Sequence, residues 1–330
     1  MKTRIFGNSG QSLSRIGLGC FSMSGAYGAA DDVESIATIH RAIDLGVTLL
    51  DTSASYGQGH NHQLIGKALK GGLRERVFIH SKTGTVRAPD GSSIAEGSGS
   101  ADRLREICEL SLKNLGIETL DAFCMSRVDP TVPIEDSIGA MARMVEEGKT
   151  RFIGLSEAAP ETVRRANAVH PLVSLQFEYS LWTRDVEGGH LAACDDLGLA
   201  LMAYAPLGYG FLTGAVGGRG ALEEGDARHK FPRFGDDNAA ANRVKVAIIQ
   251  EIAASHGATA AQIAIAWVLA RGEGVFPIPG CKSRLHLEDN LAAMALELSP
   301  EDLKTLDAAF PPGGAAGDRY EPGGMRRVNL

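Results

Sequence analysis

The sequence lacks a long hydrophobic run and a strong charge excess. Nowhere do eighteen uncharged apolar residues follow one another, and the first twenty residues lack the apolar stretch of a signal peptide. We therefore expect a cytoplasmic chain that does not enter a membrane. The net charge of −7 at pH 7 gives no general reason to expect a nucleic acid or an anionic membrane surface as a partner.

Closely spaced metal ligands and common nucleotide motifs are also missing. The five cysteines are widely spread and form no CxxC pair, so we interpret them as buried or incidental thiols. His60 and His62 stand in a Gly-rich segment without nearby acids, which favours a solvated surface loop over a metal site. No P-loop, GxSxG or HExxH motif occurs, and no complete GxGxxG fingerprint follows a strand.

A repeated pattern of helix, glycine and apolar strand organises the chain. Stretches such as DLGVTLLDTS from Asp44 and DLGLALMAYAP from Asp195 place Gly after Leu and before a short, nearly all-apolar run. Glycine readily takes the left-handed backbone that ends a helix. Strands that are covered on both faces are nearly all apolar. The pattern therefore predicts parallel strands joined by crossover helices.

About eight such units follow one another without a linker. They favour an α/β fold of the closed (β/α)8 barrel type over an open six-stranded sheet with a second domain. We expect one domain over 1–330 with an N-terminal β-hairpin, a long polar loop over 209–240, an extra C-terminal helix over 300–309 and a flexible tail over 311–330. The predicted strands cover 14–19, 47–51, 77–82, 120–125, 150–155, 173–176, 200–204 and 275–278.

Polar residues stand where the predicted strands end, which is the functional face of such a barrel. Asp51 ends the second strand, Tyr56 lies in the loop after it, and Lys82 ends the third. A lysine ammonium lowers the pKa of a neighbouring tyrosine, and a carboxylate keeps that lysine charged and oriented. The three residues therefore predict a general acid that protonates an oxygen. The alternative is a structural Asp–Lys ion pair with an unrelated tyrosine.

The segment IPGCKSRLHLEDN, residues 278–290, leads from the eighth strand into a helix. Lys282 and Arg284 stand at the start of this helix, where free N–H groups also favour an anion. The segment predicts a phosphate site, with a solvated basic helix start as the alternative.

Seven segments together resemble the aldo-keto reductases, especially the bacterial branch that is similar to potassium-channel β subunits. They are DTSASYG, SKTG, SRVDPTVPIEDSIGAM, GLSE, LQFEYSLW, AYAPLGYGFLTG and IPGCKSRLHLEDN, in family order over nearly the whole chain. The resemblance implies a barrel that binds NADPH (or NADP⁺) in extended form without a Rossmann domain, takes a small carbonyl compound as substrate, and uses no metal.

The resemblance also assigns residues. Asp51, Tyr56 and Lys82 match three members of the catalytic tetrad, with Tyr56 as the proton donor. Ser156 and Gln176 match residues that bind the nicotinamide carboxamide. The full set of implied cofactor-binding positions is Cys20, Asp51, Ser156, Gln176, Tyr204, Ala205, Pro206, Leu207, Gly208, Gly210, Gly280, Lys282, His286, Asp289 and Asn290. Tyr27, Trp182, the 209–240 loop and the tail are expected to build the substrate pocket.

The chain departs from the family pattern at Ser126, where the family has its fourth catalytic residue, a histidine. A serine hydroxyl is shorter than an imidazole and cannot carry positive charge. His80 lies two positions before Lys82 and therefore on the same strand face. We hypothesise that His80 fills the space vacated at position 126 and partly replaces its imidazole. The alternative is a buried structural histidine one layer below the chemistry.

Three functions follow from these residues. The first is an NADPH-dependent reductase of aldehydes or ketones. The second is reduction of a conjugated C=C bond, or another specialised biosynthetic step, for which a missing histidine is less damaging. The third is an NADPH-binding sensor or regulatory protein with little turnover. The oligomeric state stays open.

Overall fold

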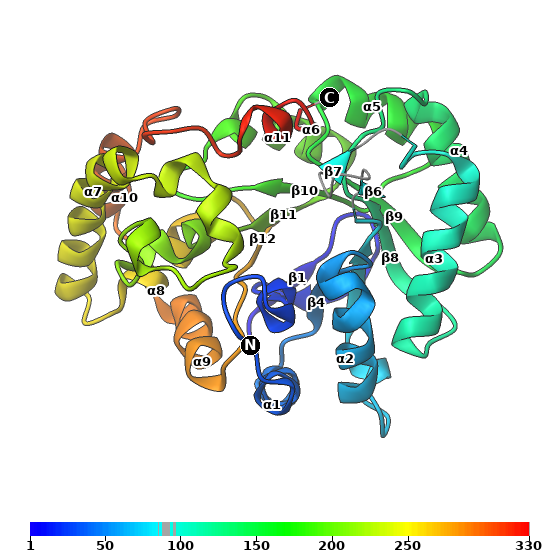
Figure 1. The fold of residues 1–330 in the computed structure, drawn as a ribbon, viewed down its shortest axis with the longest axis horizontal. Coiled ribbons are helices and arrows are strands. Elements are labelled where there is room, and N and C mark those ends of the chain that lie inside the picture. The colour runs from blue at the N-terminus through cyan, green and yellow to red at the C-terminus, as the bar shows by residue number, and fades with distance from the viewer. Residues whose placement is uncertain (85, 88–92, 95–96, 330) are drawn as a thin grey trace.

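Eight parallel strands form a closed barrel. The structure is a computed structural model that describes residues 1–84, 86–87, 93–94 and 97–329. The strands lie in the order β3, β4, β5, β8, β9, β10, β11, β12. The Gly17 N–H donates to the Pro277 carbonyl at 3.0 Å, and the Gly19 N–H donates to the Pro279 carbonyl at 3.1 Å, which joins the last strand to the first. The predicted (β/α)8 barrel is therefore confirmed (Figure 1).

The barrel strands are β3 (Leu18–Gly19), β4 (Leu49–Ser53), β5 (Phe78–Lys82), β8 (Leu120–Met125), β9 (Thr150–Ser156), β10 (Ser174–Glu178), β11 (Ala200–Tyr204) and β12 (Val275–Ile278). The helices are α1 (Asp32–Asp44), α2 (His60–Ala68), α3 (Ala101–Leu115), α4 (Ile134–Glu146), α5 (Pro160–Val169), α6 (His190–Leu197), α7 (Asp236–Ser255), α8 (Ala260–Leu269), α9 (Arg284–Ala292), α10 (Pro300–Ala309) and α11 (Pro322–Met325). A short antiparallel pair, β6 (Val86–Arg87) and β7 (Ser93–Ile94), follows β5.

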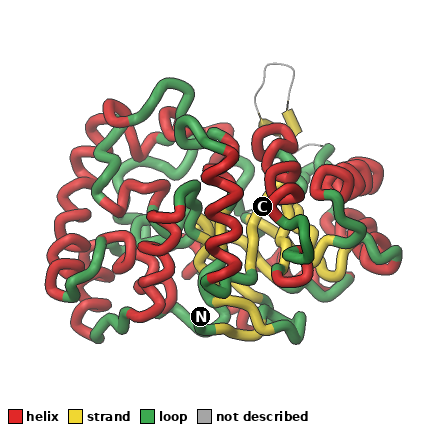
Figure 2. The backbone as a smooth tube through the Cα atoms, turned by 90° about the horizontal axis from the view of Figure 1, so that it is seen from below, coloured by secondary structure: helices red, strands yellow, loops and turns green. Residues whose placement is uncertain are grey.

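The predicted N-terminal hairpin closes one end of the barrel. It consists of β1 (Thr3–Ile5) and β2 (Ser12–Ser14), beside the N-terminus in Figure 2. Phe6, between the two strands, is fully buried, and its ring centroid lies 5.2 Å from that of Phe78 and 5.1 Å from that of Phe276. This end of the barrel is apolar, so polar side chains inside the barrel gather toward the opposite, C-terminal ends of the strands.

The predicted first strand over 14–19 was too long. In the structure β2 ends at Ser14, and the barrel strand β3 covers only Leu18–Gly19. The Ser14 N–H donates to Thr48 Oγ1 at 2.8 Å, and the Ser14 hydroxyl donates to the Ile16 carbonyl at 2.9 Å. These bonds turn the chain between the two strands.

The polar loop over 209–240 contains more helix than the sequence predicted. Four short 3₁₀ helices lie within 208–234, and the 20-residue helix α7 begins at Asp236. Helix α7 was not predicted, because large apolar side chains are sparse in its first half. Its buried Val246, Ile249 and Ile252 all lie in the second half.

The tail over 311–330 is docked against the barrel, which differs from the flexible tail that we predicted. Arg319 is only 4% exposed and forms ion pairs with Glu157 and Glu178. Near the end of the tail, the Asn329 N–H donates to the Glu157 carbonyl at 2.7 Å, and the Asn329 side chain contacts His190 of α6. These polar contacts join residues that are far apart in the sequence, so the Gly-rich local sequence does not indicate them.

No single helix in the described ranges is both long and apolar enough to span a membrane. Helices α7 and α8 are long and apolar enough only when they are counted as one segment, and the chain bends by 91° between them.

Candidate active site

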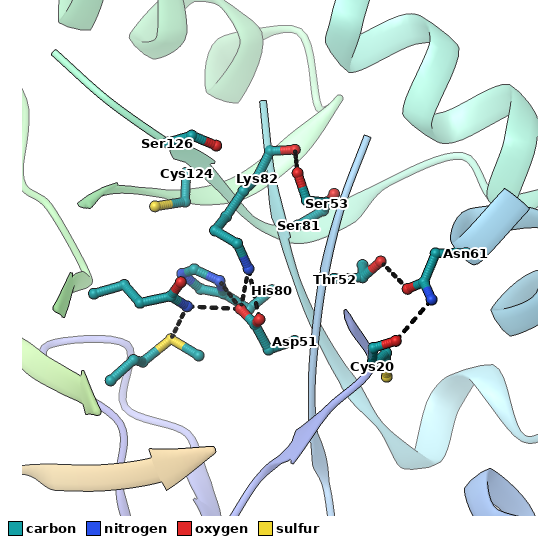
Figure 3. A network of polar contacts seen from close by, with 12 residues as sticks. Cys20, Asp51, Thr52, Ser53, Asn61, His80, Ser81, Lys82, Cys124 and Ser126 are labelled. Atoms are coloured by element: carbon teal, nitrogen blue, oxygen red, sulfur yellow. Dashed lines mark hydrogen bonds and ion pairs between the residues drawn. The ribbon is translucent and has the colours of Figure 1, made fainter. Parts of the chain in front are cut away.

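Strand register brings the predicted acid and lysine together. Asp51 on β4 pairs with His80 on β5, and Lys82 pairs with Cys124 on β8. Successive side chains of a strand alternate between its two faces. His80 and Lys82 therefore share one face of β5, and both reach Asp51 inside the barrel (Figure 3).

Asp51 and Lys82 form a buried ion pair. Lys82 Nζ lies 2.6 Å from Asp51 Oδ1 and 2.5 Å from Oδ2, and the side chains are 7% and 5% exposed. Burial by itself would lower the pKa of Lys82, but the Asp51 carboxylate raises it above its ordinary value. Burial would likewise raise the pKa of Asp51, yet Lys82 and His80 hold it low. Both groups therefore stay ionised at neutral pH.

His80 contacts this pair from the same face of β5, two residues before Lys82. It is fully buried, with Nδ1 3.2 Å from Asp51 Oδ1 and Nε2 3.1 Å from the Ser174 hydroxyl. Burial lowers the pKa of His80 although Asp51 acts in the opposite direction, so the ring is neutral at pH 7. His80 is not part of the cavity wall that Ser126 lines. Its placement supports the alternative of a buried histidine that holds Asp51, rather than a replacement for the imidazole missing at position 126.

Tyr56 lies next to the ion pair, with Lys82 Nζ 5.1 Å from its ring centroid. Burial raises the pKa of Tyr56 to about 12, and the Lys82 charge opposes this rise without outweighing it. We expected lysine to lower the pKa of this tyrosine, and the direction of its influence agrees, but burial is the larger effect. The phenol is therefore protonated at neutral pH, as a proton donor must be.

Ser126 faces the same cavity from the end of β8. Its side-chain oxygen accepts a hydrogen bond from the Gly84 N–H at 2.7 Å, and its own N–H donates to Thr83 Oγ1 at 3.0 Å. These two bonds fix the position of the serine. A hydroxyl has one donor as well as two acceptor sites. Among the described residues none accepts a hydrogen bond from the Ser126 hydroxyl, so its hydrogen can donate toward a bound oxygen.

One cavity of about 740 Å³ contains nearly all of the predicted positions. Cys20 and Gly208 are the exceptions. Cys20 is fully buried, and Gly208 packs so closely under Trp182 that an added Cβ would lie 2.7 Å from that ring. Trp182 itself stacks on Phe211 away from the cavity, which corrects its predicted place in the substrate pocket. Tyr209, Arg228 and Phe231 of the predicted 209–240 loop and Tyr320 of the tail line the cavity, whereas Phe21, Ser55 and Arg127 are wall residues that the sequence did not assign.

Three residues other than glycine have left-handed backbone just after the strands β9 and β11. Glu157, after β9, has a φ of 56°, and Ala205 and Tyr209, after β11, have φ values of 48° and 58°. Residues other than glycine rarely adopt this conformation. Such strain is maintained where the surrounding structure requires it, and it is commonest at functional sites.

The predicted phosphate corner is partly occupied by an acidic side chain. Glu34 accepts a hydrogen bond from the Arg284 N–H at 3.0 Å and pairs with its guanidinium at 2.9 Å. Lys282 donates to the Tyr27 carbonyl at 3.0 Å and contacts that of Ala29. Lys282 lines the cavity together with His286, whereas Arg284 does not. Of the two predicted cations, only Lys282 therefore faces the cavity.

The predicted surface loop at His60 and His62 is helical instead. Both residues belong to α2, and His62 is fully buried with Nε2 3.0 Å from the Ser81 hydroxyl. Within the described residues, no three His, Cys, Asp or Glu side chains gather as a metal site would require.

Burial of His62 predicts a dependence of stability on pH. Burial, followed by the Lys82 charge, lowers the pKa of His62 to about 4, whereas an unfolded histidine titrates near 6.5. Between these values only the unfolded state binds the proton, so stability is full above pH 6.5 and falls on acidification. Protonation of His62 in the unfolded state should lower the free energy of unfolding by about 2 kcal/mol between pH 6.5 and 5, which urea titrations at each pH measure. His62→Gln should flatten this slope and His229→Gln should not; parallel slopes for His62→Gln and the parent would contradict the prediction.

Comparison with known proteins decides the family. A family model described as "Aldo/keto reductase family" matches residues 15–310. The chain belongs to the aldo/keto reductase family. This membership confirms the predicted reductase class and its NADPH cofactor. The particular branch and the roles of the individual residues stay predictions.

Relatives and solved structures agree over nearly the full length. A probable aldo-keto reductase 1 of Glycine max is 41% identical over 321 residues, which is 96% of this chain and 91% of that protein. The glycerol dehydrogenase of Gluconobacter oxydans has a TM-score of 0.81 and 26% identity, covering 97% of both chains. An aldo-keto reductase of Klebsiella pneumoniae in complex with NADPH has a TM-score of 0.74 and 28% identity, covering 97% of this chain and 99% of that one.

Proposed function

We propose that this aldo-keto reductase reduces the carbonyl group of an aldehyde or ketone with NADPH, and that Tyr56 donates the proton. The observation that carries the proposal is the contact of Tyr56 with the Lys82–Asp51 ion pair on the wall of one large cavity. A neutral phenol beside a fixed ammonium is suited to protonate an oxygen that gains negative charge.

The cavity wall fits NADPH from one end to the other. Ser156 and Gln176 offer polar groups for the carboxamide, and Tyr204 presents a ring for the nicotinamide. At the far end, the Lys282 ammonium, which contacts the Tyr27 and Ala29 carbonyls, offers positive charge for a phosphate, and Asn290 offers a polar group for adenosine. When bound, NADPH supplies the hydride that reduces the carbonyl carbon.

The residues of this chain control the proton. Tyr56 gives its hydroxyl proton to the substrate oxygen, and the Lys82 ammonium stabilises the phenolate left behind. Asp51 holds Lys82 in place, and His80 in turn holds Asp51 by a hydrogen bond. Ser126 offers the oxygen a second, neutral hydrogen bond, in the place where the family has an imidazole.

Loss of NADPH absorbance with separate panels of aldehydes, ketones and enones tests the proposal. Turnover of aldehydes or ketones is the expected result. Turnover of enones alone would favour reduction of a C=C bond. Tight NADPH binding without turnover on any panel would contradict the reductase and favour a sensor. A cytoplasmic location and the absence of nucleic-acid and membrane partners stay predictions.

Ser126→His is expected to raise kcat/KM for aldehydes by about 10-fold, because an imidazole adds a stronger donor beside Tyr56. Steady-state kinetics with a neutral aldehyde measures this. Ser126→Gln is the matched control, since it adds bulk without an ionisable ring. An unchanged kcat/KM in Ser126→His, with intact folding and NADPH binding, would show that the serine does not limit the reaction.

A further inference from the structure

Arg127 differs from the other arginine of the cavity wall because most of its hydrogen-bond donors have no partner among the residues that the structure describes. Arg228 is held by Asp226 at 2.6 Å. Arg127 donates from Nη1 to the Ser126 carbonyl at 2.6 Å, and within the described residues no carboxylate lies within ion-pair distance of it. Arg127 is partly buried and lines the cavity.

The position of Arg127 places its charge near the reacting groups. It follows Ser126 directly, and it lines the same cavity as Tyr56. Burial raises the pKa of Tyr56 to about 12. The positive charges of Lys82 and Arg127 both oppose this rise. Tyr56, Ser126 and Arg127 line one cavity, so a ligand whose carbonyl oxygen lies between Tyr56 and Ser126 shares that cavity with the Arg127 side chain.

The acidic groups named here already have other partners. Asp51 is bound by Lys82, and Asp289 accepts hydrogen bonds from the side chains of Thr259 and Gln262. Glu157, whose charge also acts on Arg127, lies 2.5 Å from Arg319. Arg127 therefore acts on Glu157 through its charge without a direct ion pair, and among the described residues its guanidinium has no carboxylate partner.

We propose that Arg127 binds an anionic group of the substrate, so that the preferred substrates are short aldehydes or ketones that carry a carboxylate a few bonds from the carbonyl. The planar guanidinium matches a carboxylate with two parallel hydrogen bonds. A phosphate offers the same oxygen chemistry. This inference rests on the proposed carbonyl reductase and names its substrate class.

The test compares 4-carboxybenzaldehyde with methyl 4-formylbenzoate, which differ in charge but little in shape. The unaltered enzyme should prefer the acid. Arg127→Met should lower kcat/KM for the acid by about 10- to 100-fold and leave the ester within about 2-fold, because only the acid makes the charged hydrogen bonds. Arg127→Lys should recover part of the loss, and Arg103→Met on the surface of α3 should change neither substrate. Glyceraldehyde 3-phosphate against glyceraldehyde distinguishes a phosphate preference from a carboxylate preference.

A binding measurement separates this inference from the proposed function. With NADP⁺ present, benzoate should raise the melting temperature of the unaltered protein more than benzyl alcohol does, and Arg127→Met should remove the difference. Failure of every aldehyde to react would contradict the reductase, whereas the benzoate result would still support or overturn the anion site. Equal losses on acid and ester in Arg127→Met would show a structural role. An unchanged acid preference in Arg127→Met, or no preference in the unaltered enzyme, would also overturn the inference.

Discussion

Replacing Arg319 with methionine is expected to lower the free energy of unfolding by about 3 to 5 kcal/mol. The Arg319 side chain is 2% exposed and lies 2.5 Å from Glu157 and 3.1 Å from Glu178, both of which are fully buried. Burial by itself would raise the pKa of Glu157, but the positive charges of Arg319 and Arg127 hold it below its ordinary value. Loss of Arg319 leaves two buried carboxylates without their main counter-charge.

Urea denaturation followed by tryptophan fluorescence measures this effect. Arg326→Met, an exposed position in the same tail, is the matched control and should stay within about 0.5 kcal/mol of the parent. Adding Glu178→Gln to Arg319→Met should recover part of the stability, because it removes one of the stranded charges. A loss below about 1 kcal/mol in Arg319→Met would contradict the prediction.

The same substitution should also weaken cofactor binding. Arg319 donates to the Tyr204 hydroxyl at 3.0 Å, and the neighbouring Tyr320 hydroxyl lies 2.8 Å from that of Tyr204. Tyr204 is the ring that we expect to stack on the nicotinamide, so the docked tail supports the cofactor site from behind. Quenching of protein fluorescence by NADPH measures the affinity of the folded variant.

Tyr56→Phe is expected to lower kcat for carbonyl reduction by about 10²- to 10⁴-fold, the usual contribution of a positioned general acid. The substitution removes the hydroxyl alone. The ring that remains keeps its contact with Phe21, whose centroid lies 4.6 Å away. NADPH affinity and stability should therefore change little.

Stopped-flow and steady-state measurements of NADPH oxidation test this expectation, with NADPH binding as the control for an intact site. Lys82→Met should cost a comparable amount, and the double variant should cost little more than either single one, because the residues act as a unit. A loss below about 10-fold in Tyr56→Phe would mean that another group supplies the proton.

Local sequence patterns predicted the barrel and most of its functional face. The Leu-Gly helix ends and short apolar strands indicated the parallel topology, and polar residues at strand ends indicated Asp51, Lys82 and Ser126. These features depend on backbone conformation and on the two-residue period of a strand, which neighbouring residues in the chain determine. The same reasoning overextended the first barrel strand and missed α7, where the local apolar pattern is weak.

Contacts between distant segments were decided by the tertiary structure alone. Arg319 meets Glu178 across 141 residues, and His80 meets Ser174 across 94. The sequence marked the tail as flexible and left the role of His80 open, because a Gly-rich segment or a lone histidine has no local pattern that names its partner. Local sequence patterns were enough to predict the barrel and the catalytic candidates. The ion pairs of Arg319 and the contacts of His80 could be found only in the folded structure, since pairing depends on how the strands and the tail pack around one cavity.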